Sequence, residues 1–148
     1  MAKSSFTRRN LPHWTPARAT YFITWRLHRA QSCLSDVERD LVVNIFKHDD
    51  GSRYHLHAWV VMDDHVHLLV TPISDNSLSS LLHSWKSFSA NRLQRLHNRR
   101  GRVWQDESYD RFVRELDEAQ RYARYIVQNP VKRWPHATTP YLWVGSVL

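Results

Sequence analysis

The sequence predicts an α+β protein in which helices pack against an antiparallel sheet. Runs of β-branched and aromatic residues mark four strands, and apolar residues at helical spacing mark three helices. The resulting order, β-α-β-β-α-β followed by one more helix, matches a ferredoxin-like sandwich in its first six elements. The chain of 148 residues fits one domain with its own hydrophobic core, and no internal repeat divides it.

The first half of the chain supplies a strand and a helix. Residues 21–28 are rich in aromatic and β-branched side chains and are expected to form the first strand. Ser35 can cap a helix, and Glu38 three residues later completes a capping box. The apolar residues that follow recur at helical spacing, and the turn-forming residues 49–51 are expected to end this helix.

Two further strands are expected over 54–62 and 65–71. Between them, Asp63 and Asp64 suit a two-residue hairpin turn. Proline cannot donate to a sheet, so Pro72 is expected to stop the second of these strands.

The second half is expected to hold a long helix, a strand and a final helix. Apolar residues recur at helical spacing over 77–96, and the basic loop 99–101 follows. A fourth strand is expected over 109–116. Asp117 can cap the last helix, which should end near Pro130 because proline disfavours helical backbone in the residue before it.

These elements divide the chain into a core and two ends. The catalytic core is expected over 20–134. Residues 1–19 are expected to form an extended basic arm, and residues 135–148 a tail.

Positive charge is concentrated in two segments. The net charge is +7, and arginine supplies 17 of the 21 cations. Residues 1–35 and 76–105 each carry six cations and no acid. Such segments favour a polyanionic partner and salt-dependent binding, and the aromatic residues among them favour nucleic acid, since bases stack on such rings. Two solvated faces without a partner would show the same pattern.

Composition also excludes some classes of protein. The single cysteine, Cys33, cannot form an internal disulfide, so a reducing, cytoplasmic location is expected. No apolar run is long enough for a membrane helix, and no signal peptide is expected.

A histidine pair lies inside the third predicted strand. Because side chains alternate across a strand, His65 and His67 share one face and could chelate one divalent ion. Hydrogen-bonded histidines within the sheet would look the same. The pair His55 and His57 has the same spacing on the preceding strand, but a two-residue turn would place it on the opposite face, so that only one pair can join a given site.

The last predicted helix carries a second candidate. Tyr125 and Asn129 lie one turn apart and share a face with Glu118 and Arg121. The more apolar stripe of this helix contains Tyr122. Tyr122 is therefore expected in the core, and Tyr125 is expected to face a site.

The pattern of motifs resembles a known family. The segment 58–70, which contains His65-Val66-His67, is similar to the HUH segment (histidine, bulky hydrophobe, histidine) of single-tyrosine transposases. The remaining similar segments follow in the family's order: 8–14, 21–25, 104–105, 109–111 and 125–132. The opening is similar to the branch called REP-associated tyrosine transposases. The resemblance covers roughly residues 8–134, and its specificity comes from the combination rather than from the histidines alone.

The resemblance implies an activity and a set of site residues. Such enzymes cut and rejoin single-stranded DNA that carries a hairpin, through a 5′-phosphotyrosine bond, without a nucleotide cofactor. Tyr125 matches the nucleophile, and His65, His67 and Asn129 match the ligands of Mg²⁺ or Mn²⁺. Since imidazole suits later transition metals better than Mg²⁺, we expect a weak ion site that DNA phosphate and water complete.

One departure from the family lies directly before the histidine pair. Many relatives have Pro-Asn or Pro-Glu there, whereas this chain has Asp63-Asp64. A turn still fits these residues. Contact of Asp64 with the metal or with a bound base is the alternative.

The basic segments are expected to hold the DNA, in the cytoplasm and in association with the nucleoid. Charge reversal of Arg99 and Arg100 is expected to weaken binding and to flatten its salt dependence. The sequence leaves open whether the protein is a monomer or a homodimer. The expected DNA-binding residues are Arg8, Arg9, Arg18, Lys86, Arg92, Arg95, Arg99, Arg100, Arg102, Trp104 and Arg121.

Two other functions remain open at this point. A non-catalytic single-stranded DNA or RNA binding module would explain the charge and the aromatic residues, but not the convergence of His65, His67, Tyr125 and Asn129. A histidine phosphoesterase acting by acid–base catalysis would need histidines on opposite sides of a phosphate.

Overall fold

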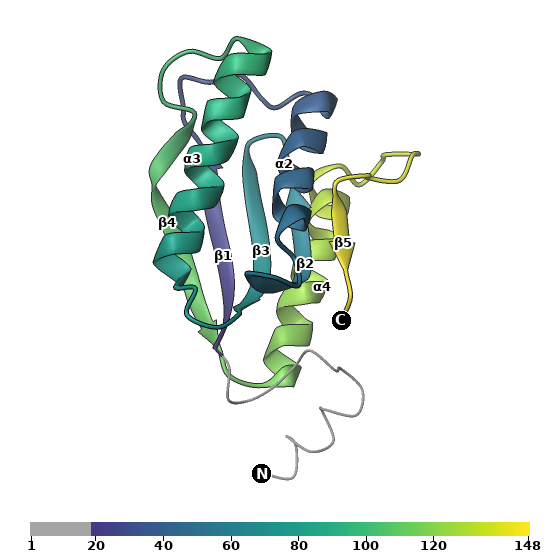
Figure 1. The fold of residues 1–148 in the computed structure, drawn as a ribbon. Helices are drawn as coiled ribbons and strands as arrows, with labels where there is room; N and C mark the ends of the chain where they lie inside the picture. Colours follow the sequence, from purple (N-terminus) through teal and green to yellow (C-terminus); the bar gives the residue numbers. More distant parts are fainter. Residues whose placement is uncertain (1–18) are drawn as a thin grey trace.

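The computed structural model describes residues 19–148 and confirms the α+β class. Its five strands form one antiparallel sheet in the order β4-β1-β3-β2-β5. Helices α2 and α3 cover one face and α4 lies on the other (Figure 1). The elements are β1 (Thr20–Leu27), α2 (Asp36–His48), β2 (Tyr54–Val61), β3 (His65–Pro72), α3 (Leu78–His97), β4 (Trp104–Val113), α4 (Leu116–Arg133) and β5 (Val144–Ser146).

The two faces of the sheet bury two separate apolar clusters. Under α2 and α3, the rings of Trp25, Phe46 and Trp85 pack against one another with centroids about 6 Å apart. Under α4, a smaller cluster joins Phe22 and Leu69 to the apolar stripe of the helix. β1 and β3 contribute to both clusters, so α4 packs against the strand that carries the histidine pair, β3.

The predicted helix ends are confirmed for α2 and α3. The hydroxyl of Ser35 accepts from the amide of Glu38, whose carboxylate accepts from the amide of Ser35. At the C-terminal end of α3, Asn98 adopts a left-handed conformation with φ of 55°, which ends the helix.

The register around the predicted turn is also confirmed. Val60 lies opposite His67, and the amide of Met62 donates to the carbonyl of His65. His65 and His67 therefore point to the face that α4 partly covers. Val66, Leu68 and Val70 point into the cluster under α2 and α3, as the alternation predicts.

The predicted face of the other histidine pair is wrong. The pairing of β2 with β3 shifts between Leu56 and Ala58, so one extra residue of β2 changes the alternation. His55 lies opposite Thr71, and His57 Nε2 lies 2.8 Å from Thr71 Oγ1. Both therefore share the face of His67, where His57 takes part in a buried hydrogen-bond chain rather than in the site.

The fourth strand and the last helix begin at other residues than predicted. β4 starts at Trp104, five residues before the expected start, and ends at Val113. Glu115, not Asp117, is the N-cap of α4, and its side chain makes no capping hydrogen bond. Asp117 instead lies in the first turn, where its charge complements the helix dipole.

The last helix also continues beyond its predicted end at Pro130. Pro130 lies on the buried stripe of α4 with Ala119, Ala123 and Ile126, so packing against the sheet offsets the lost backbone hydrogen bond. The amide of Trp134 donates to the carbonyl of Pro130, which shows that the helical pattern resumes at once.

The expected tail is part of the sheet. β5 pairs with β2, and Gly145 lies opposite Trp59. A Cβ at position 145 would lie 2.2 Å from a ring atom of Trp59, so only glycine fits there. The hydroxyl of Tyr141 adds a 2.6 Å hydrogen bond to the carbonyl of Val61. The short strand has too little periodicity for the sequence to reveal it.

Candidate active site on the open half of the sheet

Helix α4 covers only half of its face of the sheet. It packs mainly on β2, β3 and β5, with Phe22 of β1 against its edge, and leaves the rest of this face of β1 and β4 open beside it. The open strip is a groove of about 530 Å³. It is lined by Phe22, Thr24, Arg26, His67, Tyr109, Glu118, Arg121, Tyr122 and Tyr125. The histidine strand and the tyrosine helix thus meet along one edge of this groove.

The histidine pair lies at the floor of this region. His65 and His67 are both buried, and their ring centroids lie 4.8 Å apart. His65 Nδ1 lies 2.7 Å from Asp64 Oδ1, and His67 Nδ1 lies 2.7 Å from Thr24 Oγ1. Each ring therefore has its Nδ1 held by a neighbour, which leaves Nε2 of both rings as the nitrogen for a further ligand.

The electrostatics keep one of these rings neutral. Burial, followed by the positive charges of His65 and Arg26, lowers the pKa of His67 to about 3. A neutral imidazole is the form that binds a metal ion. Burial alone would raise the pKa of Asp64, but the hydrogen bond from His65 and the nearby positive charges outweigh it and lower that pKa. Asp64 thus remains a carboxylate beside the histidine.

Tyr125 projects from α4 toward the same place. Its ring centroid lies 5.4 Å from that of His67 and 5.9 Å from that of Phe22. The side chain remains 43% exposed, so it is open to a ligand in the groove. Lys132 Nζ lies 5.7 Å from the centre of the Tyr125 ring and adds positive charge. The predicted approach of the tyrosine to the histidine pair is therefore present within one chain.

Tyr122 has a more mixed role than the sequence predicts. Its ring stacks on Phe22 with centroids 4.5 Å apart and packs against the cluster under α4. It also lines the groove. Glu118 and Arg121 line the same groove, which confirms the predicted common face of these residues with Tyr125.

The expected donor set is two imidazoles and one amide, but Asn129, unlike His67, is not among the residues that line the groove. Asn129 lies on α4 one turn beyond Tyr125 and is partly buried. Over residues 19–148, no group of three or more His, Cys, Asp and Glu side chains is placed to hold a metal ion. An ion held here would depend on Asn129, DNA oxygens or water to complete its coordination, as expected for a weak site.

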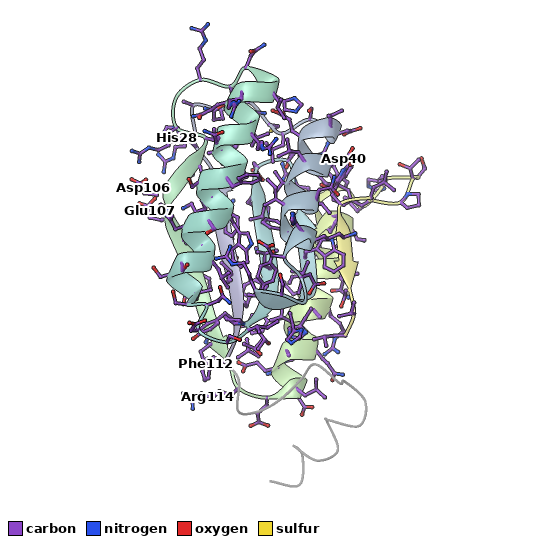
Figure 2. The ribbon with its side chains drawn as sticks, in the orientation of Figure 1. His28, Asp40, Asp106, Glu107, Phe112 and Arg114 are labelled. Carbon is purple, nitrogen blue, oxygen red and sulfur yellow. The ribbon has the colours of Figure 1, made fainter. Side chains whose placement is uncertain are left out.

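The second basic segment lies on the other side of the sheet. α3 covers the face opposite α4, so most of the expected DNA contacts between 86 and 102 do not share a face with Tyr125. Lys86 is tied to β4, where its Nζ donates to the carbonyls of Gln105 and Asp106. The acids Asp106 and Glu107 project at the outer edge of β4 (Figure 2).

Two of the expected DNA contacts are wrong because the side chains are buried. Trp104 is only 4% exposed, and its Nε1 donates to Ser89 Oγ in the core, so no base can stack on it. Arg99 forms a two-pronged ion pair with Glu38, with Nε to Oε2 at 2.6 Å and Nη2 to Oε1 at 2.7 Å. It also donates to the carbonyls of Ser32 and Cys33.

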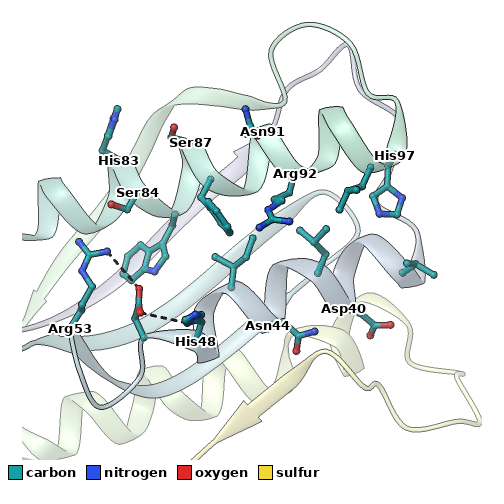
Figure 3. Close-up of a pocket in the computed structure, with 17 residues that line it drawn as sticks. Asp40, Asn44, His48, Arg53, His83, Ser84, Ser87, Asn91, Arg92 and His97 are labelled. Atoms are coloured by element: carbon teal, nitrogen blue, oxygen red, sulfur yellow. Dashed lines mark ion pairs between the residues drawn. The ribbon is translucent and has the colours of Figure 1, made fainter.

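The remaining arginines of this segment are exposed on α3 and the loop after it. Arg92 lies over the ring of Phe88, 4.8 Å from its centre. Both residues line a groove of about 1070 Å³ between α2 and α3 (Figure 3). Arg102 pairs with Asp106, and Arg95 and Arg100 are open to solvent. Arg8, Arg9 and Arg18 lie outside the described residues.

The structure adds two arginines that the sequence analysis did not single out. Arg26 lies opposite His65 on β1 and lines the groove. Arg111 lies opposite Phe22 on β4, and its guanidinium donates to the Tyr109 hydroxyl. Alternation along β1, starting from the pairing of Thr24 with His67, is the signal that could have found Arg26.

Over residues 19–148, no helix is long and apolar enough to cross a membrane.

Comparison with known proteins decides the family. A model of the family described as IS200-like transposases matches residues 16–129. The chain belongs to this transposase family. A curated relative, the REP-associated tyrosine transposase of Escherichia coli (strain K12), is 24% identical in an alignment 147 residues long that covers 86% of each chain.

Two solved structures share the transposase fold. The structure of a REP-associated tyrosine transposase bound to a REP hairpin has a TM-score of 0.61 at 24% identity, over 78% of this chain and 68% of that one. A transposase structure from Deinococcus radiodurans R1 has a TM-score of 0.53 at 21% identity, over 78% of this chain and 90% of that one. The predicted resemblance and fold class are thereby confirmed.

Proposed function

We propose that this transposase cuts and rejoins single-stranded DNA at the open groove, with Tyr125 as the nucleophile. The Tyr125 oxygen attacks a backbone phosphorus and loses its proton. A bond forms between Tyr125 and the phosphorus, and the bond to the 3′-oxygen breaks. The leaving oxygen takes up a proton to become a 3′-hydroxyl. Attack by a 3′-hydroxyl on the phosphotyrosine reverses these steps and rejoins the strand, because the covalent bond conserves the energy of the phosphodiester.

One observation carries this proposal: the centroid of the exposed Tyr125 ring lies 5.4 Å from that of the His67 ring, at the edge of a groove. A non-catalytic binding module would give no reason for the tyrosine to lie so close to the histidine. The two histidines also share one face and lie beside each other, whereas acid–base cleavage needs them on opposite sides of a phosphate.

Basic side chains around the groove would bind the strand. Arg26, Arg111 and Arg121 come from three different elements on this face, and Arg121 lies one turn before Tyr125. Their guanidinium groups are suited to two-pronged contact with phosphate. The exposed rings of Tyr109 and Tyr125 would stack on unpaired bases.

His65, His67 and Asn129 would hold the divalent ion. The free Nε2 atoms and the low pKa of His67 fit this role, because both provide an unprotonated imidazole. When bound, Mg²⁺ or Mn²⁺ supplies Lewis-acid stabilisation of the charge that develops on the phosphate. Donors rich in imidazole favour Mn²⁺ over Mg²⁺. We expect stronger activity with Mn²⁺ at equal low concentration.

The substrate we propose is a single strand that carries a hairpin. The support is the relative whose structure is bound to a REP hairpin, together with the net charge of +7 and the arginines beside the open groove. A monomer could perform the first cleavage, since the tyrosine and the histidines approach each other within one chain.

Covalent trapping tests the proposal. The protein is mixed with labelled hairpin-bearing strands and Mn²⁺, denatured in detergent and separated on a gel. We expect a shifted band that is lost with EDTA and in Tyr125→Phe, and that persists in Tyr109→Phe. No band on a strand that the protein binds tightly would overturn the proposal in favour of a non-catalytic binder. Strand cleavage without metal and without a shifted band would favour the histidine phosphoesterase, because acid–base catalysis forms no covalent bond to the protein.

A further inference from the structure

The last turn of α4 is tied to the turn that carries the histidine pair. Arg133 Nη2 lies 3.1 Å from Asp63 Oδ2, and its Nη1 lies 3.6 Å from Asp64 Oδ1. The same Asp64 oxygen lies 2.7 Å from His65 Nδ1. A continuous chain of polar contacts therefore runs from α4 through Asp64 to His65.

The β2–β3 turn at one end of this chain is held firmly by its backbone. The amide of Leu27 donates to the carbonyl of Asp64, and the amide of Leu34 donates to the carbonyl of Asp63, each at 2.8 Å. The amide of Met62 closes the turn on the carbonyl of His65. The two carboxylates are therefore presented to Arg133 from a fixed frame.

The helix end is held as well. Trp134 follows Arg133 directly, and its ring stacks on Tyr141 with centroids 5.4 Å apart. Tyr141 is bonded to the carbonyl of Val61, next to the turn. Tyr125 lies about two helical turns before Arg133, so a shift of the helix end would shift Tyr125 too.

We propose that Arg133 and Asp64 are positioning residues that couple the tyrosine helix to the histidine pair. Asp64 holds His65 with its proton on Nδ1, which directs Nε2 to the ion site. Arg133 holds Asp64 and fixes α4, and hence Tyr125, against the same turn. This inference rests on the proposed function, since it assigns these residues a part in that reaction. In this chain both carboxylates of Asp63-Asp64 lie within reach of Arg133.

Stability and positioning can be separated at this site. The side chains of Arg133 and Asp64 are each 40% exposed, and ion pairs of this kind contribute little to folding. Loss of either residue should therefore change the reaction far more than the melting temperature. The pair Arg53 and Asp49 provides a matched control, since it is a partly exposed ion pair with N to O at 3.6 Å beyond the opposite face of the sheet.

A double-mutant cycle tests the coupling. The variants are Arg133→Gln, Asp64→Asn and the two combined, with Arg53→Gln and Asp49→Asn as controls. The rate of covalent adduct formation is measured at saturating DNA over a Mn²⁺ titration, together with the dissociation constant for the strand in EDTA. Hydrogen exchange of α4 is measured on the same proteins without DNA.

We expect Arg133→Gln and Asp64→Asn each to slow adduct formation about 10-fold, in the range seen when residues that orient metal ligands are removed. The combined variant should be no slower than the slower single variant, because both act through one chain of contacts. Asp64→Asn should also raise the Mn²⁺ concentration needed for half-maximal rate. The strand's dissociation constant should stay nearly unchanged, and Arg133→Lys should restore part of the rate.

Two results would overturn the inference. Multiplying effects in the combined variant would show that the residues act independently. A large rise in the dissociation constant of Arg133→Gln would make Arg133 a DNA contact instead. If the wild-type protein forms no adduct, the proposed function itself fails. Hydrogen exchange then still tests whether Arg133 couples α4 to the turn. The coupling predicts faster exchange at the end of α4 in Arg133→Gln but not in Arg53→Gln.

Discussion

Arginines in two regions of this transposase carry the same charge and differ in their surroundings in the structure. In the loop after α3, the guanidinium of Arg99 is buried against Glu38 and two backbone carbonyls. Beside α4, Arg26 and Arg121 are exposed along the groove that contains Tyr125. The first region holds the fold together, and the second faces the site.

The difference shows that a local charge count does not reveal which acids a cation meets in space. Arg99 belongs to a segment without acids, yet its partner is 61 residues away on α2. Arg26 lies in a strand between buried residues and still points to the open face, because alternation places every second side chain of β1 there. Orientation rather than density of charge separates the structural arginines from those that face the groove.

The largest expected effect lies in the structural region. Arg99→Gln leaves the Glu38 carboxylate buried without its cation, which should lower the free energy of unfolding by roughly 3–5 kcal/mol. Arg102→Gln, which breaks an exposed pair with Asp106, should cost at most about 1 kcal/mol. Urea denaturation of both variants measures the difference. Equal losses would erase the distinction between the two kinds of arginine.

The next effect lies in the site. His65→Ala and His67→Ala should slow adduct formation by at least about 100-fold, a magnitude typical of losing a group that stabilises developing charge. DNA binding in EDTA should persist, since the groove arginines remain. His55→Ala serves as the control on the neighbouring strand. Adduct formation by His65→Ala at the wild-type rate would remove the histidine pair from the mechanism.

The pH dependence of stability provides a third contrast. His67 has a folded-state pKa of about 3, below its ordinary value near 6.5, so the unfolded chain binds more protons between these values. Stability should therefore fall as the pH is lowered through this window, by up to about 2 kcal/mol between pH 6.5 and 5. His67→Gln should remove that contribution.

Glu38 acts over a lower range of pH. Burial alone would raise the pKa of Glu38, but hydrogen bonds from Arg99 and Ser35 outweigh it and lower the pKa to about 2. Its contribution is present above about pH 4.5 and is lost as the pH falls toward 2. Urea unfolding of wild type, His67→Gln and Glu38→Gln at a series of pH values separates the two windows. A wild-type slope unchanged in His67→Gln would contradict the first assignment.

The smallest effect concerns DNA binding. Arg121→Gln and Arg26→Gln should each weaken binding and reduce the slope of log affinity against log salt by about 1, as for the loss of one phosphate contact. Folded Arg99→Gln should leave the slope unchanged. Arg95 and Arg100 are exposed on the far side of the sheet, and their variants show whether the DNA reaches around the molecule. If only Arg99→Gln changed the salt dependence of binding, Arg99 would be the DNA contact and the groove arginines would not.

The fold was predictable where local signals agree with packing. The capping box at Ser35, the turn at Asp63-Asp64 and the alternation of β3 each specify one local geometry, and all are present. The bulge that moves His57 and the continuation of α4 through Pro130 depend on tertiary contacts, so no local pattern reveals them.

The candidate site divides in the same way. Strand periodicity predicted that His65 and His67 share a face, and helical periodicity predicted that Tyr125 faces a site. That the two meet was implied only by the family resemblance, and the structure brings the rings of Tyr125 and His67 together. Burial of Trp104 and Arg99 could not be predicted, because it depends on partners distant in the sequence such as Ser89 and Glu38.

The attachment point of the DNA tests the central claim most directly. Three tyrosines line the groove, and trypsin separates them: Tyr109 falls in peptide 103–111, Tyr122 in 122–124 and Tyr125 in 125–132. After adduct formation in Mn²⁺ and nuclease trimming, mass spectrometry identifies the peptide that carries the nucleotide. Our account predicts the nucleotide on peptide 125–132. A nucleotide on either of the other two peptides would contradict it.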